Sequence, residues 1–106
     1  MRTQDSTKAI VVGAGVAGLA TAIRLAAQGF ETSVYESASK PGGKIKEDSK
    51  KGYRFDLGPS LFTMPELLME LDDLARTSAY AKKEEMPHVF TYQTLDRSTH
   101  YFWEDG

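Results

Sequence analysis

A glycine pattern near the start of the chain restricts the fold more than any other feature of the sequence. Gly13, Gly15 and Gly18 follow a short β-branched run at 8–12 and open an alanine- and leucine-rich stretch at 16–28. Such a run ending at glycine predicts a strand buried on both faces, as in a parallel sheet. Apolar residues at spacings of three and four then predict a helix with one packing side. We therefore expect a strand, a tight turn and a helix in succession.

A second strand follows the predicted helix. Gly29 stands where a helix-terminating glycine belongs, and residues 30–35 are rich in β-branched and aromatic side chains up to Glu36. Strand, helix and strand together make a βαβ unit, so a parallel sheet begins here. The predicted fold class is α/β, the N-terminal part of a Rossmann-like domain.

The glycine spacing has a chemical meaning in this context. Gly13 permits the tight turn, Gly15 lets the backbone approach a pyrophosphate, and Gly18 lets the helix lie close to the strand. The N–H groups near Val16 and Ala17 face outward at the helix start, with the helix dipole behind them. The motif predicts a binding site for a dinucleotide, held without a lysine.

An acidic residue completes this pattern. Glu36 lies 23 residues after Gly13, at the end of the second predicted strand. A carboxylate there accepts hydrogen bonds from a ribose diol and repels a 2′-phosphate. The fingerprint alone does not distinguish NAD from FAD.

The middle of the chain predicts a small hairpin and an amphipathic helix. A loop at 37–43 leads into residues 44–48, a polar turn at 49–52 and an alternating strand at 53–57. A helix then begins near Pro65. Its leucines repeat at helical spacing, and its acidic residues fall largely on the other side: Glu66, Glu70, Asp72 and Asp73.

The last part of the sequence indicates a second, antiparallel region. Residues 89–92 and 100–103 are rich in aromatic and β-branched side chains and resemble an antiparallel pair. We predict two incomplete domains, a nucleotide-binding part at 1–80 and the start of another domain at 81–106.

Composition excludes several functions. The 106 residues are 41% hydrophobic, with 13 basic and 15 acidic side chains, a net charge of −2 and no cysteine. Nothing in this balance favours a nucleic acid as partner, and thiolate metal sites are excluded. His88 and His100 have no third ligand near them in the sequence, so we expect no metal. Ser60 lacks the surroundings of a nucleophile.

Two further segments resemble a known superfamily. Glu36-Ser-Ala-Ser-Lys-Pro-Gly-Gly-Lys44 and Tyr53-Arg-Phe-Asp-Leu-Gly-Pro-Ser60 resemble motifs of the flavin-containing amine oxidases and carotenoid desaturases. The resemblance covers about residues 9–74, with a weaker match at 101–106. Within the superfamily the chain looks most like the bacterial phytoene desaturase branch.

The resemblance implies FAD as the cofactor and adds site residues. The diglycine loop would run beside the FAD pyrophosphate, and the second segment would bring a glycine close to the flavin. The added candidates are Ser37, Gly43, Lys44, Gly58, Pro59 and Ser60. The family usually has arginine where Lys44 stands, so the positive charge is kept but the planar fork is lost.

The activity implied by the resemblance is FAD-dependent removal of hydride from a long hydrophobic polyene, a carotenoid. By the same analogy we expect the sequence to be an N-terminal fragment that is inactive alone, and we name no catalytic residue in it. The parent protein would be cytoplasmic and would touch the inner face of the membrane peripherally. The alternatives are a flavin amine oxidase and a nucleotide-binding fragment without catalysis.

Overall fold

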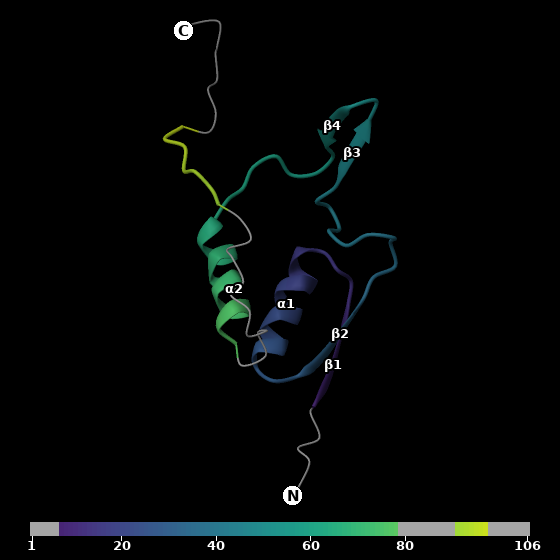
Figure 1. Cartoon of the computed structure of the whole chain (residues 1–106), viewed down its shortest axis with the longest axis vertical. Helices are drawn as coiled ribbons and strands as arrows, with labels where there is room; N and C mark the ends of the chain where they lie inside the picture. Colours follow the sequence, from purple (N-terminus) through teal and green to yellow (C-terminus); the bar gives the residue numbers. More distant parts are fainter. Residues whose placement is uncertain (1–6, 79–90, 98–106) are drawn as a thin grey trace, which may run out of the picture.

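The computed structural model describes residues 7–78 and 91–97. Figure 1 shows α1 between two neighbours, the strands β1 and β2 on one side and α2 on the other. A separate hairpin, β3–β4, follows β2. The elements in chain order are β1 (Lys8–Val12), α1 (Val16–Ala27), β2 (Glu31–Tyr35), β3 (Glu47–Lys50), β4 (Tyr53–Asp56) and α2 (Pro65–Thr77).

The first three elements form the predicted βαβ unit. β1 and β2 pair in parallel, from Lys8 opposite Glu31 to Val12 opposite Tyr35. α1 makes the connection between them and packs on the pair. The fold class predicted from the sequence, the α/β start of a Rossmann-like domain, is confirmed.

Gly29 ends α1 as predicted. Its φ of 96° lies in the left-handed region, its N–H donates to Ala26, and the N–H of Phe30 donates to Leu25, both at 3.0–3.1 Å. These two bonds form a Schellman motif, which satisfies carbonyl groups of the last helical turn. The chain then turns back sharply enough for β2 to begin at Glu31, two residues after the glycine.

The predicted burial of β1 on both faces is wrong for the described chain. Val11 faces α1, where its Cγ1 would lie 3.6 Å from a Cβ placed on Gly18. Ile10 and Val12, which alternate with it, are 68% and 85% exposed. α1 covers one face of the sheet, and no described element covers the other. A continuous apolar run predicts the strand correctly, but it does not predict which layers cover the two faces of that strand.

The helix α1 has two packing sides where the sequence predicted one. It contacts the sheet on one side and α2 on the other, and Ala22 is its most buried residue. Val16 and Leu19, expected on the packing side, are 56% and 38% exposed. The position of Val16 has a local reason, because it borders a groove at the helix start.

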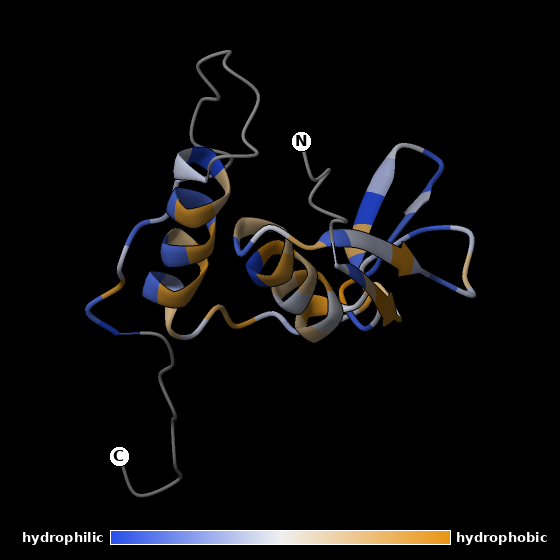
Figure 2. Cartoon of the chain, turned by 90° about the horizontal axis from the view of Figure 1, so that it is seen from below, coloured by the Kyte–Doolittle hydropathy of each residue, from blue (hydrophilic) through white to orange (hydrophobic). Residues whose placement is uncertain are grey.

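The helix α2 begins with Pro65, as predicted, and packs on α1, with Leu71 as its buried apolar residue. Figure 2 shows its hydrophilic residues along the side that faces away from α1. Arg24 of α1 forms an ion pair with Glu70 of α2 at 2.9 Å.

One acidic residue of α2 lies on the packed side. Asp72 was predicted on the polar side of the helix, but only 8% of its surface is exposed. Arg76, one turn later, lies 3.3 Å from its carboxylate. A buried charge with such a partner is tolerated where an unpaired one would be costly.

The predicted hairpin is confirmed, with a shorter turn. Lys50 pairs with Tyr53, so only Lys51 and Gly52 form the loop, with φ values of 51° and 83°. Two central residues with positive φ make a type I′ turn, whose twist matches that of the strands. The predicted turn at 49–52 was two residues too long, because the first half of it continues β3.

The later part of the chain leaves some predictions untested. Residues 91–97 form neither helix nor strand. The rest of the predicted antiparallel pair, together with His88 and His100, lies outside the described residues. The division into parts 1–80 and 81–106 stays a prediction. In the part of the chain that the structure describes, no helix has the length and apolar character needed to cross a membrane.

The close packing of α1 on the loop before it gives a first prediction. A Cβ on Gly18 would lie 1.9 Å from the carbonyl oxygen of Gly13. Although alanine is the better helix former, Gly18→Ala should destabilise the chain by about 1–3 kcal/mol, because the helix must move away from the turn. Urea unfolding measures the change. Thr21→Ala, on the exposed part of the same helix, is the control, and a stabilised Gly18→Ala chain would contradict the packing.

Candidate functional site

The turn between β1 and α1, called here the glycine loop (residues 13–15), is tied to the end of β2. Gly13 has a φ of 98°, which only glycine adopts readily. Its N–H donates to the carbonyl oxygen of Tyr35 at 2.7 Å. The first glycine of the motif is therefore required by the turn itself, as the sequence predicted.

The peptide groups of Ala14 connect the glycine loop to two other segments. Its N–H donates to Oε2 of Glu36 at 2.7 Å, and its carbonyl oxygen accepts from the N–H of Gly42 at 2.8 Å. Ala14 is only 4% exposed. Sequence reasoning missed this residue, because its contribution comes from backbone atoms and its side chain gives no signal.

The diglycine loop (residues 41–44) packs backbone to backbone on the glycine loop. A Cβ on Gly43 would lie 3.1 Å from the Cα of Gly15, and one on Gly58 would lie 2.1 Å from the carbonyl oxygen of Lys44. Gly42 and Gly43 both have positive φ, 123° and 61°. Three glycine-containing segments thus approach one another more closely than side chains would allow.

Gly15 differs from these glycines, because nothing in the described chain requires glycine there. Its φ of −79° suits any residue, and it precedes α1 without capping it by a side chain. A Cβ on Gly15 would meet only the Cα of Gly43, at an ordinary contact distance of 3.9 Å. The absence of a side chain leaves space in front of the helix, as the approach of a ligand to the backbone would need.

That space is a groove of about 510 Å³ at the start of α1, called here the α1 groove. The first turn of the helix carries no acidic residue, and its N–H groups have no acceptor within the helix. A groove with these properties can hold an anion. It is lined by Val12, Gly13, Gly15, Val16, Ala17, Gly18, Gly42, Gly43, Lys44, Ile45 and Pro59.

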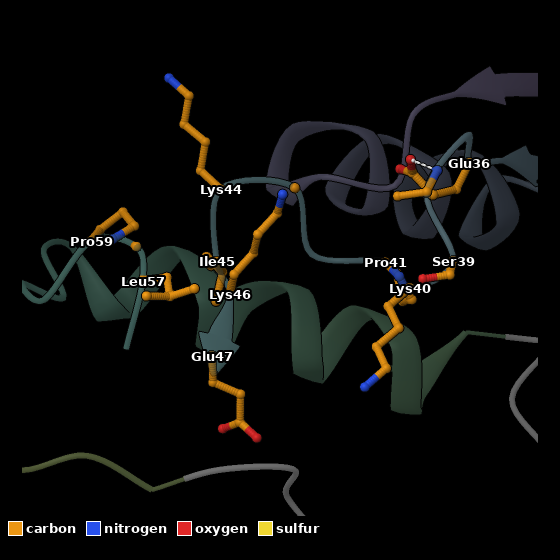
Figure 3. Close-up of a pocket in the computed structure, with 13 residues that line it drawn as sticks. Glu36, Ser39, Lys40, Pro41, Lys44, Ile45, Lys46, Glu47, Leu57 and Pro59 are labelled. Carbon is orange, nitrogen blue, oxygen red and sulfur yellow. Dashed lines mark hydrogen bonds between the residues drawn. The ribbon is translucent and has the colours of Figure 1, made fainter. Parts of the chain in front are cut away.

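A second cleft, called here the hairpin cleft, has a volume of about 1050 Å³ and shares a wall with the α1 groove. Figure 3 shows its charged residues, with Lys40, just before the diglycine loop, and Lys44, at the end of that loop, extending in different directions. The shared wall consists of Gly43, Lys44, Ile45 and Pro59. The other residues that line it are Glu36, Ala38, Ser39, Lys40, Pro41, Lys46, Glu47, Leu57 and Gly58.

The carboxylate of Glu36 is held by backbone N–H groups. Oε1 accepts from the N–H of Ala38 at 2.8 Å and from the hydroxyl of Ser37 at 3.4 Å. These bonds, that of Ala38 first and that of Ala14 next, lower the pKa of Glu36 below its usual value. The side chain is therefore ionised at neutral pH and accepts hydrogen bonds only.

The structure brings most of the predicted site residues together. Around the α1 groove and the hairpin cleft lie Gly13, Gly15, Val16, Ala17, Gly18, Glu36, Gly43, Lys44, Gly58 and Pro59. Ser37 and Ser60 are outside the lining of these two clefts, although Ser37 contacts Glu36. The sequence analysis did not select Lys40, Ile45, Lys46 or Leu57; the lysine-rich run at 40–46 was the available signal.

The sequence of this chain matches a known family of domains. The family of NAD(P)-binding Rossmann-like domains matches residues 11–76. The chain belongs to this family. The matched range includes the glycine loop, the diglycine loop and all but the last residue of α2, so the Rossmann-like domain extends over the whole site described above.

Curated relatives of this chain carry the names of carotenoid enzymes. The 1-hydroxycarotenoid 3,4-desaturase of Flavobacterium sp. (strain P99-3) is 46% identical over 102 residues, 93% of this chain and 19% of that protein. Phytoene desaturase (neurosporene-forming) of Rhodobacter capsulatus is 45% identical over 69 residues, 65% and 13% respectively. The 4,4′-diapolycopene oxygenase of Methylomonas sp. is 45% identical over 106 residues, 100% and 20%.

These relatives confirm the resemblance to carotenoid desaturases predicted from the sequence. The chain spans about a fifth or less of the length of each of them. Family and relatives together support a dinucleotide as the cofactor.

The hydrogen bonds of Glu36 give a prediction for acid stability. Since the folded pKa is lowered, the carboxylate contributes stability that is fully present above the usual glutamate pKa of about 4.3 and is lost as pH falls through the folded value. The unfolding free energy of Glu36→Gln should therefore fall less on acidification than that of the wild type. Urea unfolding at a series of pH values measures the difference. Asp48→Asn, in β3, is the control, and equal acid dependence of Glu36→Gln and the wild type would refute the assignment.

Proposed function

We propose that this Rossmann-like domain binds the ADP half of FAD and belongs to an oxidoreductase that acts on carotenoid polyenes. The observation that carries the proposal is the glycine at position 15. The fold does not require it, yet a Cβ there would project beside the α1 groove. A diphosphate lying against the backbone explains this glycine.

The diphosphate would lie at the start of α1. The N–H groups of Val16 and Ala17 belong to the first helical turn, where the positive end of the helix dipole favours an anion. Lys44 lines the same groove and adds a positive charge, although an ammonium group cannot form the bidentate contact of an arginine. Gly43 and Gly18 keep the walls of the groove close to this position.

The adenosine ribose would lie near Glu36. Two oxygens of the carboxylate already accept backbone N–H groups, but each oxygen has lone pairs left for ribose hydroxyl groups. The ionised side chain would repel a 2′-phosphate. We therefore expect FAD or NAD to bind in preference to NADP.

FAD is favoured over NAD by the segment after β4. Gly58 packs against the backbone of Lys44, and Pro59 borders both clefts. This arrangement continues the groove from the diphosphate toward residues 58–60, where the resemblance puts the flavin, with Ser60 as a hydrogen-bonding residue of the loop. When bound, FAD supplies the acceptor for a hydride.

The reaction we propose for the whole protein is desaturation of a carotenoid. Two adjacent carbons of the polyene each lose one hydrogen, one as a hydride and one as a proton, and a carbon–carbon double bond forms. The residues of this chain bind and orient the cofactor, and none of them is assigned to the chemical step. Oxygenation of the same class of substrate is the second candidate, because the 4,4′-diapolycopene oxygenase matches all 106 residues of this chain.

The location of the protein and its later domain follow from the same proposal. We place the protein in the cytoplasm, and because carotenoids partition into membranes, we expect it to contact the inner face of the membrane peripherally. The part of the chain from residue 81 onward, for which the sequence predicts antiparallel strands, would begin the domain that binds the polyene.

Flavin retention tests the cofactor proposal. Gly15→Ala should leave the unfolding free energy almost unchanged, since the added Cβ makes only an ordinary contact, but it should weaken FAD binding at least about tenfold. Gly15→Val should be worse. Binding is measured by isothermal titration calorimetry on the full chain, with FAD and NADP compared as ligands.

The matched control is Gly52→Ala in the hairpin turn. Gly52 has a φ of 83°, and a Cβ placed on it would meet no atom within 4 Å, so this change costs about 1–2 kcal/mol of stability through backbone strain alone. It should leave FAD binding unaltered. If Gly15→Ala and the wild type bind FAD equally well, or if NADP binds better than FAD, the proposal is wrong.

Product analysis separates the two candidate reactions. The whole protein, supplied with FAD and a carotenoid substrate, should release a product that has lost two hydrogen atoms and gained no oxygen. Mass spectrometry distinguishes this product from an oxygenated one. A product with added oxygen would favour the oxygenase and contradict desaturation.

A further inference from the structure

One side chain joins the two loops that border the candidate site. Oε2 of Glu36 accepts from the N–H of Ala14 at 2.7 Å, and Oε1 accepts from the N–H of Ala38 at 2.8 Å. Ala14 belongs to the glycine loop, whereas Ala38 lines the hairpin cleft. The carboxylate therefore connects the loop that follows β2 to the glycine loop, where Ala14 lies 22 residues before Glu36.

The hydrogen bond from Ala14 to Glu36 involves a buried peptide group. Ala14 is 4% exposed. If the carboxylate moved away and no other acceptor replaced it, the unsatisfied buried N–H would therefore destabilise the loop. The carbonyl oxygen of Ala14 accepts from the N–H of Gly42. The shape of the glycine loop thus depends on both partners being in place.

We propose that Glu36 is a positioning residue, which holds the glycine loop in its ligand-binding shape before any nucleotide arrives. For the identity of the ligand, this inference rests on the proposed function. It adds a role that does not depend on the ribose. Binding of a diphosphate without any sugar should then also require Glu36.

Simple electrostatics gives the opposite expectation, which makes the proposal testable. Glu36 carries a negative charge, so its removal should strengthen the binding of an anion if charge alone decides. Lys40, Lys44, Lys46 and Glu47 line the hairpin cleft with it. The partners that hold its two oxygens are, however, backbone N–H groups and the hydroxyl of Ser37.

Inorganic pyrophosphate is the probe, because it has the diphosphate and no ribose. Its affinity for the full chain is measured by calorimetry at neutral pH for the wild type, Glu36→Gln and Glu36→Ala. Glutamine keeps one acceptor oxygen and alanine keeps none. We expect binding about tenfold weaker for Glu36→Ala and an intermediate loss for Glu36→Gln.

Asp48→Asn removes the same charge from β3 and is the matched control. It should bind pyrophosphate as the wild type does, or slightly better. Equal or tighter binding of pyrophosphate by Glu36→Ala would overturn the proposal, since the loop would then be in place without the carboxylate.

A second measurement is made first on the wild-type chain, so it does not depend on Glu36→Ala being folded. In the ligand-free full chain, the amide proton shifts of Ala14 and Ala38 are followed by NMR as pH falls. Both should move with one common midpoint below the usual range for glutamate, and both titrations should be lost in Glu36→Gln. Independent midpoints, or no titration at either amide, would overturn the proposal.

The two measurements separate this inference from the proposed function. If the amides of Ala14 and Ala38 titrate together while the wild type binds no pyrophosphate, the positioning role stands and the diphosphate assignment fails. If pyrophosphate binds but the affinity is insensitive to Glu36, the diphosphate assignment stands and the positioning role fails.

Discussion

The backbone of Ala14 is the point on which the site depends. Its N–H is bonded to the side chain of Glu36 at the end of β2, and its carbonyl oxygen is bonded to Gly42 of the diglycine loop. This junction fixes the start of α1 relative to the other walls of the α1 groove. Close approach of the backbones follows from it, since Gly43 contacts Gly15 and Gly58 contacts Lys44 without intervening side chains. The geometry of the groove is therefore set by main-chain contacts together with one side chain, that of Glu36.

Charge is divided between neighbouring positions in a way that suits one kind of ligand. The start of α1 offers N–H groups and no acidic side chain, which favours a diphosphate. Glu36, with its lowered pKa, lies next to this position and favours hydroxyl groups over a further phosphate. Lysine in place of arginine at position 44 keeps the charge while losing directional recognition. The helix start and the loops consequently carry more of the recognition than they would beside an arginine.

The local elements could be predicted from the sequence, and the tertiary contacts could not. Strand, helix, Gly29 and hairpin depend on short-range propensity and turn chemistry, so the predictions agree with the structure. The uncovered face of β1 and the buried Asp72 depend on which layers meet, a property that periodicity does not contain. In the site, Gly13, Gly15 and Gly18 were found by their spacing, and Gly43 and Gly58 by the resemblance to a known superfamily. The bond between Gly42 and Ala14 joins backbone atoms distant in sequence, and no side chain in the sequence indicates it.

A crystal structure of the full chain with FAD tests the central claim most directly. The account predicts the diphosphate in the α1 groove, within hydrogen-bonding distance of the first N–H groups of α1, and the ribose hydroxyl groups on the carboxylate of Glu36 while that carboxylate still accepts from Ala14. Electron density for the nucleotide elsewhere, or a Glu36 side chain turned away from Ala14 and the ribose, would contradict it.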